Sequence, residues 1–239
     1  MKDVSAMTLQ HDVRDLESVR KHFNVERFAP IGFSYVGKVV ALYAIEHPER
    51  VSRLVQLGPV QMTMETKFPK ELTHGYEDMG APEAAVAKWQ EMQKSGAAEK
   101  LPREFCDAQW QVFQYLLVGD PKNASRVKVT CDLENEWPVN FDAHIKLVME
   151  SLAKTPLTKE SLKAVKVPVL TIHGTTDRNA PHGSGPEWAM SPPDARLVTV
   201  EGAAHAAWID DPVTVFSAIR AFLRGDWPLG AETVTKMKR

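Results

Sequence analysis

The sequence is poor in cysteine, balanced in charge and free of long apolar runs. Cys106 and Cys131 are its two cysteines, too few for a disulfide framework or a cysteine-rich zinc site, and they favour a reducing compartment. The 29 Lys and Arg residues against 31 Asp and Glu residues leave a net charge of -2, which gives no sign of a nucleic-acid or membrane-surface partner. No apolar run approaches the roughly 20 residues of a membrane span, and the start lacks the apolar core of a signal peptide. We therefore expect a cytoplasmic protein without a membrane span.

The overall composition is that of a folded domain. Of the 239 residues, 44% are hydrophobic and 25% are charged, which excludes the disordered and collagen-like classes. The length is ample for a sizeable hydrophobic core and predicts one domain with an insertion.

The first quarter of the chain alternates between helix and strand patterns. Apolar residues recur every three or four positions over residues 12–22, which predicts an amphipathic helix. Residues 28–33 form an apolar run, a helical pattern covers residues 35–47, and residues 51–57 are apolar again. Two strands joined by a helix pair in parallel. The predicted fold class is therefore α/β, with a mostly parallel sheet flanked by helices.

The middle of the chain differs from its two ends. Helices are predicted at residues 84–93, 104–118 and 141–153, separated by loops that contain Pro, Gly and Asp. Apolar strands return at residues 167–172 and 195–200, and a last helix is predicted at residues 212–223. We therefore divide the chain into an α/β core of residues 1–60 and 166–239 and an inserted helical region of residues 61–165.

A serine lies at the junction of the first predicted strand with the helix that follows it. In the stretch Gly-Phe-Ser-Tyr-Val-Gly, Gly32 lies two positions before Ser34, and Val36 lies two positions after it. Gly37 follows Val36. A G-x-S-x-G elbow holds its serine in a strained backbone conformation and needs small residues where strand and helix nearly touch. Gly32 meets this demand and Val36 departs from it. The alternative is that Ser34 simply caps the next helix.

A carboxylate and a histidine follow two later strands in the same way. Asp177 lies in the loop after residues 167–172, and His205 follows residues 195–200. A serine nucleophile needs a base within hydrogen-bond reach and a carboxylate to orient that base. Ser34, Asp177 and His205 each lie just after a predicted strand, so we expect all three at the carboxyl edge of one sheet. Taken singly, Asp177 could bind its own turn and His205 could be structural.

The stretch of residues 25–59 resembles the α/β-hydrolase superfamily, and within it the proline iminopeptidase and esterase-like branch. The resemblance covers residues 12–60 and 167–223, and the inserted region is similar to a helical cap in length and position. This resemblance implies that Ser34 is the nucleophile, His205 the general base and Asp177 the acid that orients it. It also implies that the backbone N–H of Tyr35 donates to the oxyanion and that the cap shapes the substrate pocket.

Members of this superfamily carry about four strands before the elbow, together with a His-Gly-rich loop that supplies a second oxyanion donor. Only 33 residues precede Ser34, so we expect an amino-terminally shortened sheet and leave the source of the second donor open. The strand at residues 28–33 then becomes an apolar edge with unpaired backbone groups. We predict that the chain forms a homodimer through this edge or covers it with its own first residues.

The residues leave three functions to compare. The first is a serine hydrolase that cleaves small carboxylic esters through an acyl-enzyme. The second is a proline iminopeptidase-like aminopeptidase, which takes an amide substrate and in which Glu134 and Glu136 would hold the substrate ammonium. The alternative for these two residues, which we favour, is a solvated acidic loop. The third is a non-catalytic α/β-hydrolase-like binding protein. The remaining histidines show no metal-site spacing, so we expect neither a metal nor a cofactor.

Overall fold

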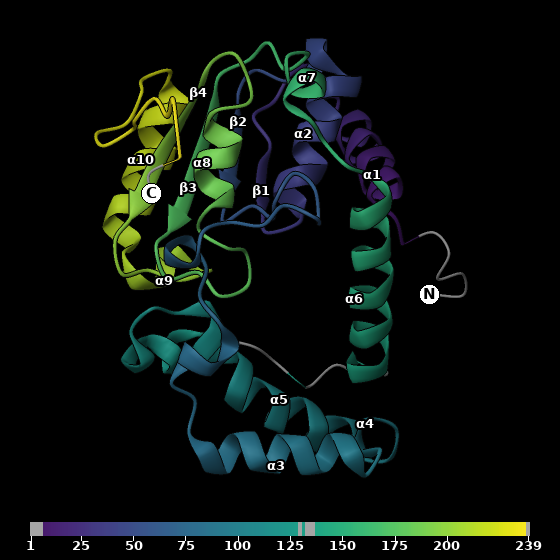
Figure 1. Ribbon diagram of the computed structural model, residues 1–239. Coiled ribbons are helices and arrows are strands. Elements are labelled where there is room, and N and C mark those ends of the chain that lie inside the picture. Colours follow the sequence, from purple (N-terminus) through teal and green to yellow (C-terminus); the bar gives the residue numbers. More distant parts are fainter. Residues whose placement is uncertain (1–6, 129–130, 132–136, 238–239) are drawn as a thin grey trace.

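Four parallel strands form one sheet in the order β1-β2-β3-β4 (Figure 1). The computed structural model describes residues 7–128, 131 and 137–237. The strands are β1 (Ile31–Phe33), β2 (Leu54–Leu57), β3 (Val169–Gly174) and β4 (Ala195–Val200). The register pairs Phe33 with Leu57 and Leu57 with Ile172, so neighbouring strands end at the same edge of the sheet. The predicted α/β class with a mostly parallel sheet is confirmed.

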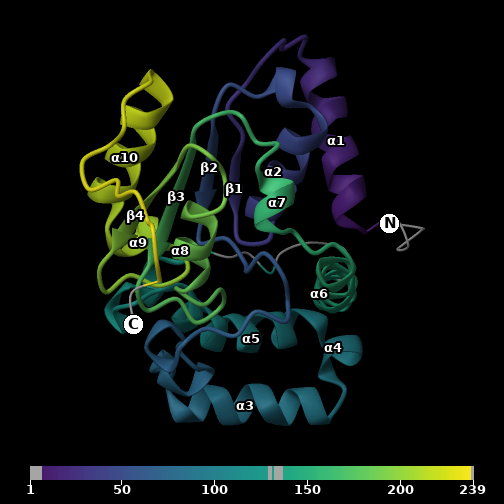
Figure 2. The same cartoon turned by 45° about the horizontal axis from the view of Figure 1, so that its top comes forward.

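Helices cover both faces of this sheet, as Figure 2 shows. On one face, α1 (Leu9–His22), α2 (Val36–Glu46) and α8 (Ser184–Ala189) share a buried cluster with Leu54 and Val169. On the other face, α9 (Ala207–Asp210) and α10 (Pro212–Arg224) pack on Val55 and Leu170. Successive strand residues point to opposite faces, which is why neighbouring residues belong to different clusters. All six residues of β3 are buried, as in a parallel sheet covered on both sides.

The segment between β2 and β3 is helical, and its described residues contain no strand. Its helices are α3 (Glu83–Lys94), α4 (Ala97–Lys100), α5 (Pro102–Leu117), α6 (Trp137–Lys154) and α7 (Lys159–Leu162). Short 3-10 helices lie at Lys70–Leu72, Tyr76–Met79 and Pro121–Arg126. The helices predicted at residues 84–93 and 141–153 lie within α3 and α6, and the one predicted at residues 104–118 extends one residue beyond α5. The division into a core and a cap stays a prediction.

A buried lysine ties this helical segment to the core. Lys38 of α2 is fully buried, and its Nζ donates to the carbonyls of Met62 at 3.0 Å and Leu152 at 3.4 Å. Burial lowers the pKa of Lys38 to about 8. Both ends of the helical segment are therefore bound to the helix that follows β1.

In the described residues, no helix is long and apolar enough to cross a membrane.

Strand β1 lies at the open edge of the sheet. It is shorter than the predicted strand of residues 28–33, because Phe28 makes only an isolated bridge to Val51. Ile31 is 44% exposed. Helix α1 packs on α2 and α6. Pairing of this edge with a second chain stays a prediction.

The cysteines and the last residues of the chain make contacts that the sequence did not predict. Cys106 of α5 and Cys131 form a disulfide, so the cysteines no longer support a reducing compartment. The residues after Gly225 return to the sheet. Glu232 pairs with Leu197 of β4, and the guanidinium of Arg196 lies 4.5 Å from the centre of the Trp227 ring.

Candidate active site

Ser34 occupies the strained turn that its sequence context predicts. Its φ is +55°, in the left-handed region that residues other than glycine rarely adopt. Its N–H donates to the carbonyl of Leu57 at 2.9 Å, which fixes the turn to β2. Helix α2 follows with Tyr35 at its N-cap. Within the described residues the Ser34 side chain makes no capping hydrogen bond to α2, so the helix-cap alternative finds no support.

The close approach of strand and helix explains the glycines around Ser34. A Cβ on Gly32 would lie 2.5 Å from the carbonyl oxygen of Val36, and one on Gly37 would lie 2.9 Å from Cβ of Pro59. The side chain of Val36 itself is partly buried against the cluster that contains α1 and α2. The crowded positions are therefore 32 and 37, and a β-branched residue fits at position 36.

Asp177 is buried after β3 and has both oxygens bonded. Its Oδ1 accepts the backbone N–H groups of Asn179 at 2.8 Å and Ala180 at 2.9 Å. Its Oδ2 lies 2.7 Å from Nδ1 of His205. The carboxylate therefore binds its own turn and orients the histidine at the same time. The structure brings these two predicted residues together although 28 positions separate them.

The surroundings of Asp177 keep it ionised. Burial alone would raise its pKa, but the charge of His205 and the hydrogen bonds from His173 and His205 outweigh that effect and hold the pKa well below its usual range. Because an ionised carboxylate can only accept, His205 donates through Nδ1–H. Nε2 of a neutral His205 is then left as an acceptor, as a general base requires.

A second histidine, His173, shares Asp177. His173 is the fully buried fifth residue of β3, and its Nε2 lies 3.1 Å from Oδ2 of Asp177 and 3.0 Å from the carbonyl of Ala180. Its Nδ1 is buried without a hydrogen-bond partner in the described part of the chain. An Nε2–H donor with an unprotonated Nδ1 satisfies these contacts. No role for His173 was predicted from the sequence, although its place at the end of a strand, four residues before Asp177, is a usable signal.

Gly58 provides the space in which these loops meet. It follows β2 with φ +48°, and a Cβ at this position would lie 3.1 Å from Oδ2 of Asp177 and 3.2 Å from Nδ1 of His205. Only glycine combines this conformation with this approach at low cost. Gly58 is not among the residues predicted from the sequence. Its signal is a glycine directly after a predicted strand.

The helical segment is hydrogen-bonded to the loops that carry Asp177 and His205. Leu117 of α5 accepts the N–H of Ala206 at 2.8 Å, and the carbonyl of Val118 accepts Nη1 of Arg178 at 3.2 Å. Asp210 Oδ2 accepts the N–H groups of Gly119 at 2.8 Å and Ala204 at 3.0 Å. Residues 117–119 are thus bonded to the neighbours of both Asp177 and His205.

Ser34 and His205 lie at one edge of the sheet, but no hydrogen bond joins them in the described residues. The rings of Phe33 and His205 lie 4.5 Å apart between centroids, which brings the end of β1 against the histidine loop. Glu134 and Glu136, proposed to hold an ammonium, lie outside the described residues.

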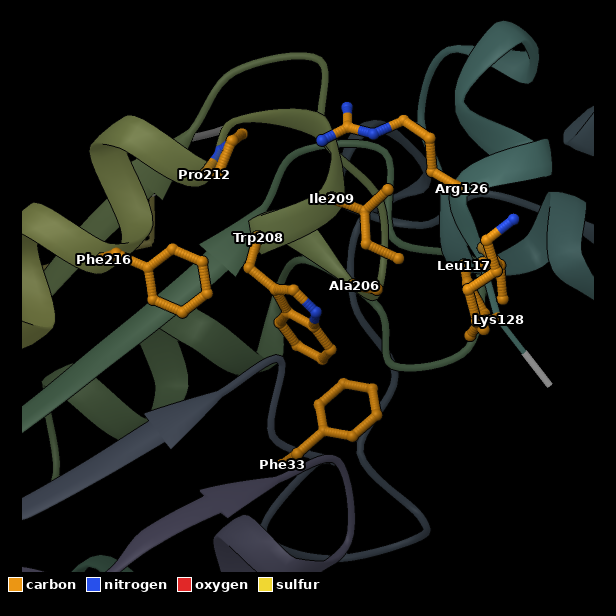
Figure 3. Close-up of a pocket in the computed structure, with 10 residues that line it drawn as sticks. Phe33, Leu117, Arg126, Lys128, Ala206, Trp208, Ile209, Pro212 and Phe216 are labelled. Carbon is orange, nitrogen blue, oxygen red and sulfur yellow. The ribbon is translucent and has the colours of Figure 1, made fainter.

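A cavity of about 520 Å³ opens beside His205 (Figure 3). It is lined by Phe33, Leu117, Arg126, Val127, Lys128, Ala206, Trp208, Ile209, Pro212 and Phe216. The wall is mostly apolar and carries two cations. In the described residues, no group of three His, Cys, Asp or Glu side chains could hold a metal ion.

Comparison with known proteins gives one family match and several distant relatives. A family model described as alpha/beta hydrolase fold matches residues 2–212. The chain is 25% identical over 236 residues to a probable 1-acylglycerol-3-phosphate O-acyltransferase of Oryza sativa subsp. japonica, covering 90% of this chain and 55% of that protein. It is 23% identical over 203 residues to the biotin biosynthesis bifunctional protein BioHC of Teredinibacter turnerae, covering 83% of this chain and 33% of that protein. The chain therefore spans about half and one third of the lengths of these curated relatives.

Solved structures similar to this chain include two hydrolases. The serine hydrolase CCSP0084 of Cycloclasticus zankles has a TM-score of 0.64 and 18% identity, with 91% of this chain and 71% of that chain covered. The esterase EaEST of Exiguobacterium antarcticum has a TM-score of 0.64 and 14% identity, with 93% and 76% covered. At these identities the likeness concerns the fold.

Proposed function

Because the chain belongs to the α/β-hydrolase fold family, we propose that it is a serine hydrolase that cleaves small carboxylic esters through an acyl-enzyme. One observation carries the proposal: the 2.7 Å hydrogen bond between His205 Nδ1 and the ionised Asp177, at the sheet edge where Ser34 is held at φ +55°. The names of two structures similar in fold, a serine hydrolase and an esterase, agree with this reaction class.

The proposed reaction uses His205 twice. Nε2 of His205 takes the proton of the Ser34 hydroxyl while Oγ attacks the ester carbonyl, and the tetrahedral intermediate then expels the alcohol, which receives that proton. Water, deprotonated by the same nitrogen, attacks the acyl-Ser34 ester; the intermediate releases the carboxylic acid, and Ser34 recovers its proton. Asp177 stays ionised throughout and stabilises the imidazolium.

The oxyanion has one proposed donor, the backbone N–H of Tyr35 at the start of α2. Removing one such donor typically lowers turnover by about 10² to 10³.

The charge of the cavity favours an ester over a peptide with a free amino terminus. Arg126 and Lys128 line it, and no carboxylate does so among the described residues. A substrate ammonium would meet two like charges there.

The test is hydrolysis of p-nitrophenyl butyrate at about pH 8 by the native chain, by Ser34→Ala and by Ser95→Ala. Ser95 is an exposed serine at the end of α3 and serves as the matched control. We expect turnover by the native chain and Ser95→Ala and none above background by Ser34→Ala. Equal rates for all three proteins would favour a binding protein. Turnover of a proline anilide in preference to the butyrate ester would favour the aminopeptidase.

A further inference from the structure

The cavity beside His205 has an aromatic wall. The Phe33 ring lies 4.5 Å from the His205 ring and 4.7 Å from the Trp208 ring, and Phe216 of α10 lines the same space. Figure 3 shows Phe33 and Trp208 next to each other. An acyl or aryl group bound here would bury apolar surface against these rings, with its ester near His205.

Two cations of the helical segment line the same cavity. In Figure 3, Arg126 extends toward Ile209 and Pro212. Nη1 of Arg126 donates to Oδ1 of Asn123 at 3.1 Å, and Nδ2 of Asn123 donates to Oδ1 of Asp210 at 2.9 Å. Asp210 thus sets the orientation of the Asn123 amide, whose oxygen in turn positions the guanidinium.

The positive charge of these two side chains is not paired within the described residues. Lys128 Nζ donates to the backbone carbonyl of Ser125 at 3.1 Å, and neither Lys128 nor Arg126 forms an ion pair there. Asp210, the carboxylate in this network, already accepts from three N–H groups. A ligand carboxylate would therefore find an exposed guanidinium and an exposed ammonium beside an apolar wall, and both can form charge-assisted hydrogen bonds with it.

We propose that this cavity selects esters that carry a carboxylate on the group bound inside it, and that Arg126 and Lys128 bind that carboxylate. The proposal rests on the proposed hydrolase function for the reaction, but the binding site itself does not depend on catalysis. The apolar part of the substrate contacts Phe33 and Trp208, and the anion lies at the margin formed by residues 126–128.

The kinetic test compares p-nitrophenyl butyrate with the mono-p-nitrophenyl ester of glutarate. We expect the native chain to have the larger kcat/KM for the glutarate ester at low salt. We expect this preference to shrink as salt rises. The double variant Arg126→Gln/Lys128→Gln should reduce the ratio of the two kcat/KM values by about tenfold. Lys122 is an exposed residue of the 3-10 helix that contains Arg126, and it does not line the cavity. Lys122→Gln should therefore leave the ratio unchanged.

A binding test separates this proposal from the hydrolase function. Calorimetric titration of Ser34→Ala with 2-naphthoate and with 2-naphthol needs no turnover. We expect the carboxylate to bind more tightly, and the double variant in the Ser34→Ala background to lose that advantage. Equal affinities, or naphthoate binding unchanged by the double variant, would overturn the proposal even if esters are hydrolysed. Naphthoate binding that depends on Arg126 and Lys128 would uphold the binding site even if no ester is turned over.

Discussion

Asp177 at the carboxyl edge of the sheet is buried with both oxygens bonded, whereas α3 in the helical segment buries none of its residues. In the first region, backbone N–H groups and two histidines hold the Asp177 carboxylate in place. In the second, the helix is exposed or partly exposed along its length and contributes no residue to the cavity. Exposed segments accept substitutions without loss of the core. The proposed chemistry therefore depends on the buried edge, and the proposed selection of a carboxylate depends on two residues of the helical segment, Arg126 and Lys128.

The two regions meet at residues 117–119. These residues bond to Ala206 and Arg178 directly and reach Ala204 through Asp210. A change on the edge side should therefore abolish the reaction, and a change at this junction should weaken it.

The largest effect is expected for Asp177→Asn. An amide at this position can no longer hold His205 with its proton on Nδ1, so Nε2 is not kept free as the base, and turnover should fall by about 10⁴-fold. The measurement is kcat for p-nitrophenyl butyrate. Asp194→Asn changes an exposed carboxylate before β4 and is the control. A loss below tenfold would mean that Asp177 only binds its own turn.

Gly58→Ala tests the space between Asp177 and His205. The added Cβ would lie 3.1 Å from the carboxylate and 3.2 Å from the imidazole, and such a displacement should lower kcat by about 10²-fold. Gly202→Ala is the matched control, because Gly202 also has a positive φ, +71°, but nothing within 4 Å of the added Cβ. Both variants should lose stability, and only Gly58→Ala should lose activity. Equal kcat in the two variants would contradict the role given to Gly58.

Asp210→Asn tests the junction between the regions. The amide cannot accept from Gly119, Asn123 and Ala204 together, so the loop before His205 loosens and kcat should fall by about tenfold, with a shifted pH profile. Asp211→Asn is the control, because Asp211 caps α10 through the N–H of Thr214 and asparagine caps nearly as well. The same loss in both variants would indicate a general weakening of this segment.

The smallest effect on turnover at pH 8 is expected for His182→Gln, whose consequence is a change in pH-dependent stability. Burial and the charge of His173 lower the pKa of His182 to about 4. Between about pH 6.5 and 4 the unfolded chain binds a proton that the folded chain does not, so the free energy of unfolding falls as the pH falls through this range.

Urea unfolding at about pH 7 and pH 4.5 measures this effect. The native chain should lose more stability between these two values than His182→Gln does. His22→Gln, at an exposed histidine of α1, should behave like the native chain. Identical losses in all three proteins would show that His182 does not stay neutral in the fold.

The strands, the turn at Ser34 and the loops of Asp177 and His205 could be predicted because each carries its own local signal. Gly32 precedes a strained turn, and apolar runs mark the strands before Asp177 and His205. The contacts of His173 and Gly58 could not be predicted, because they arise only when separate strands are brought into register. The disulfide was missed because cysteines that are distant in sequence give no sign of their distance in space.

The bonds of residues 117–119 to the core were also missed. They join backbone groups, and backbone groups carry no sequence signal. The length of β1 was overestimated, because the apolar residues before Ile31 continue the strand-like sequence pattern but do not continue the regular pairing with β2.

Covalent labelling tests whether Ser34 is a nucleophile activated by His205 and Asp177. The native chain and the variants Ser34→Ala and His205→Gln are incubated with diethyl p-nitrophenyl phosphate, and each product is mapped by mass spectrometry. The account predicts one diethylphosphoryl group per native chain, on the peptide that contains Ser34, none there in Ser34→Ala and much slower labelling in His205→Gln. An unlabelled Ser34, or labelling that proceeds equally fast without His205, would contradict it.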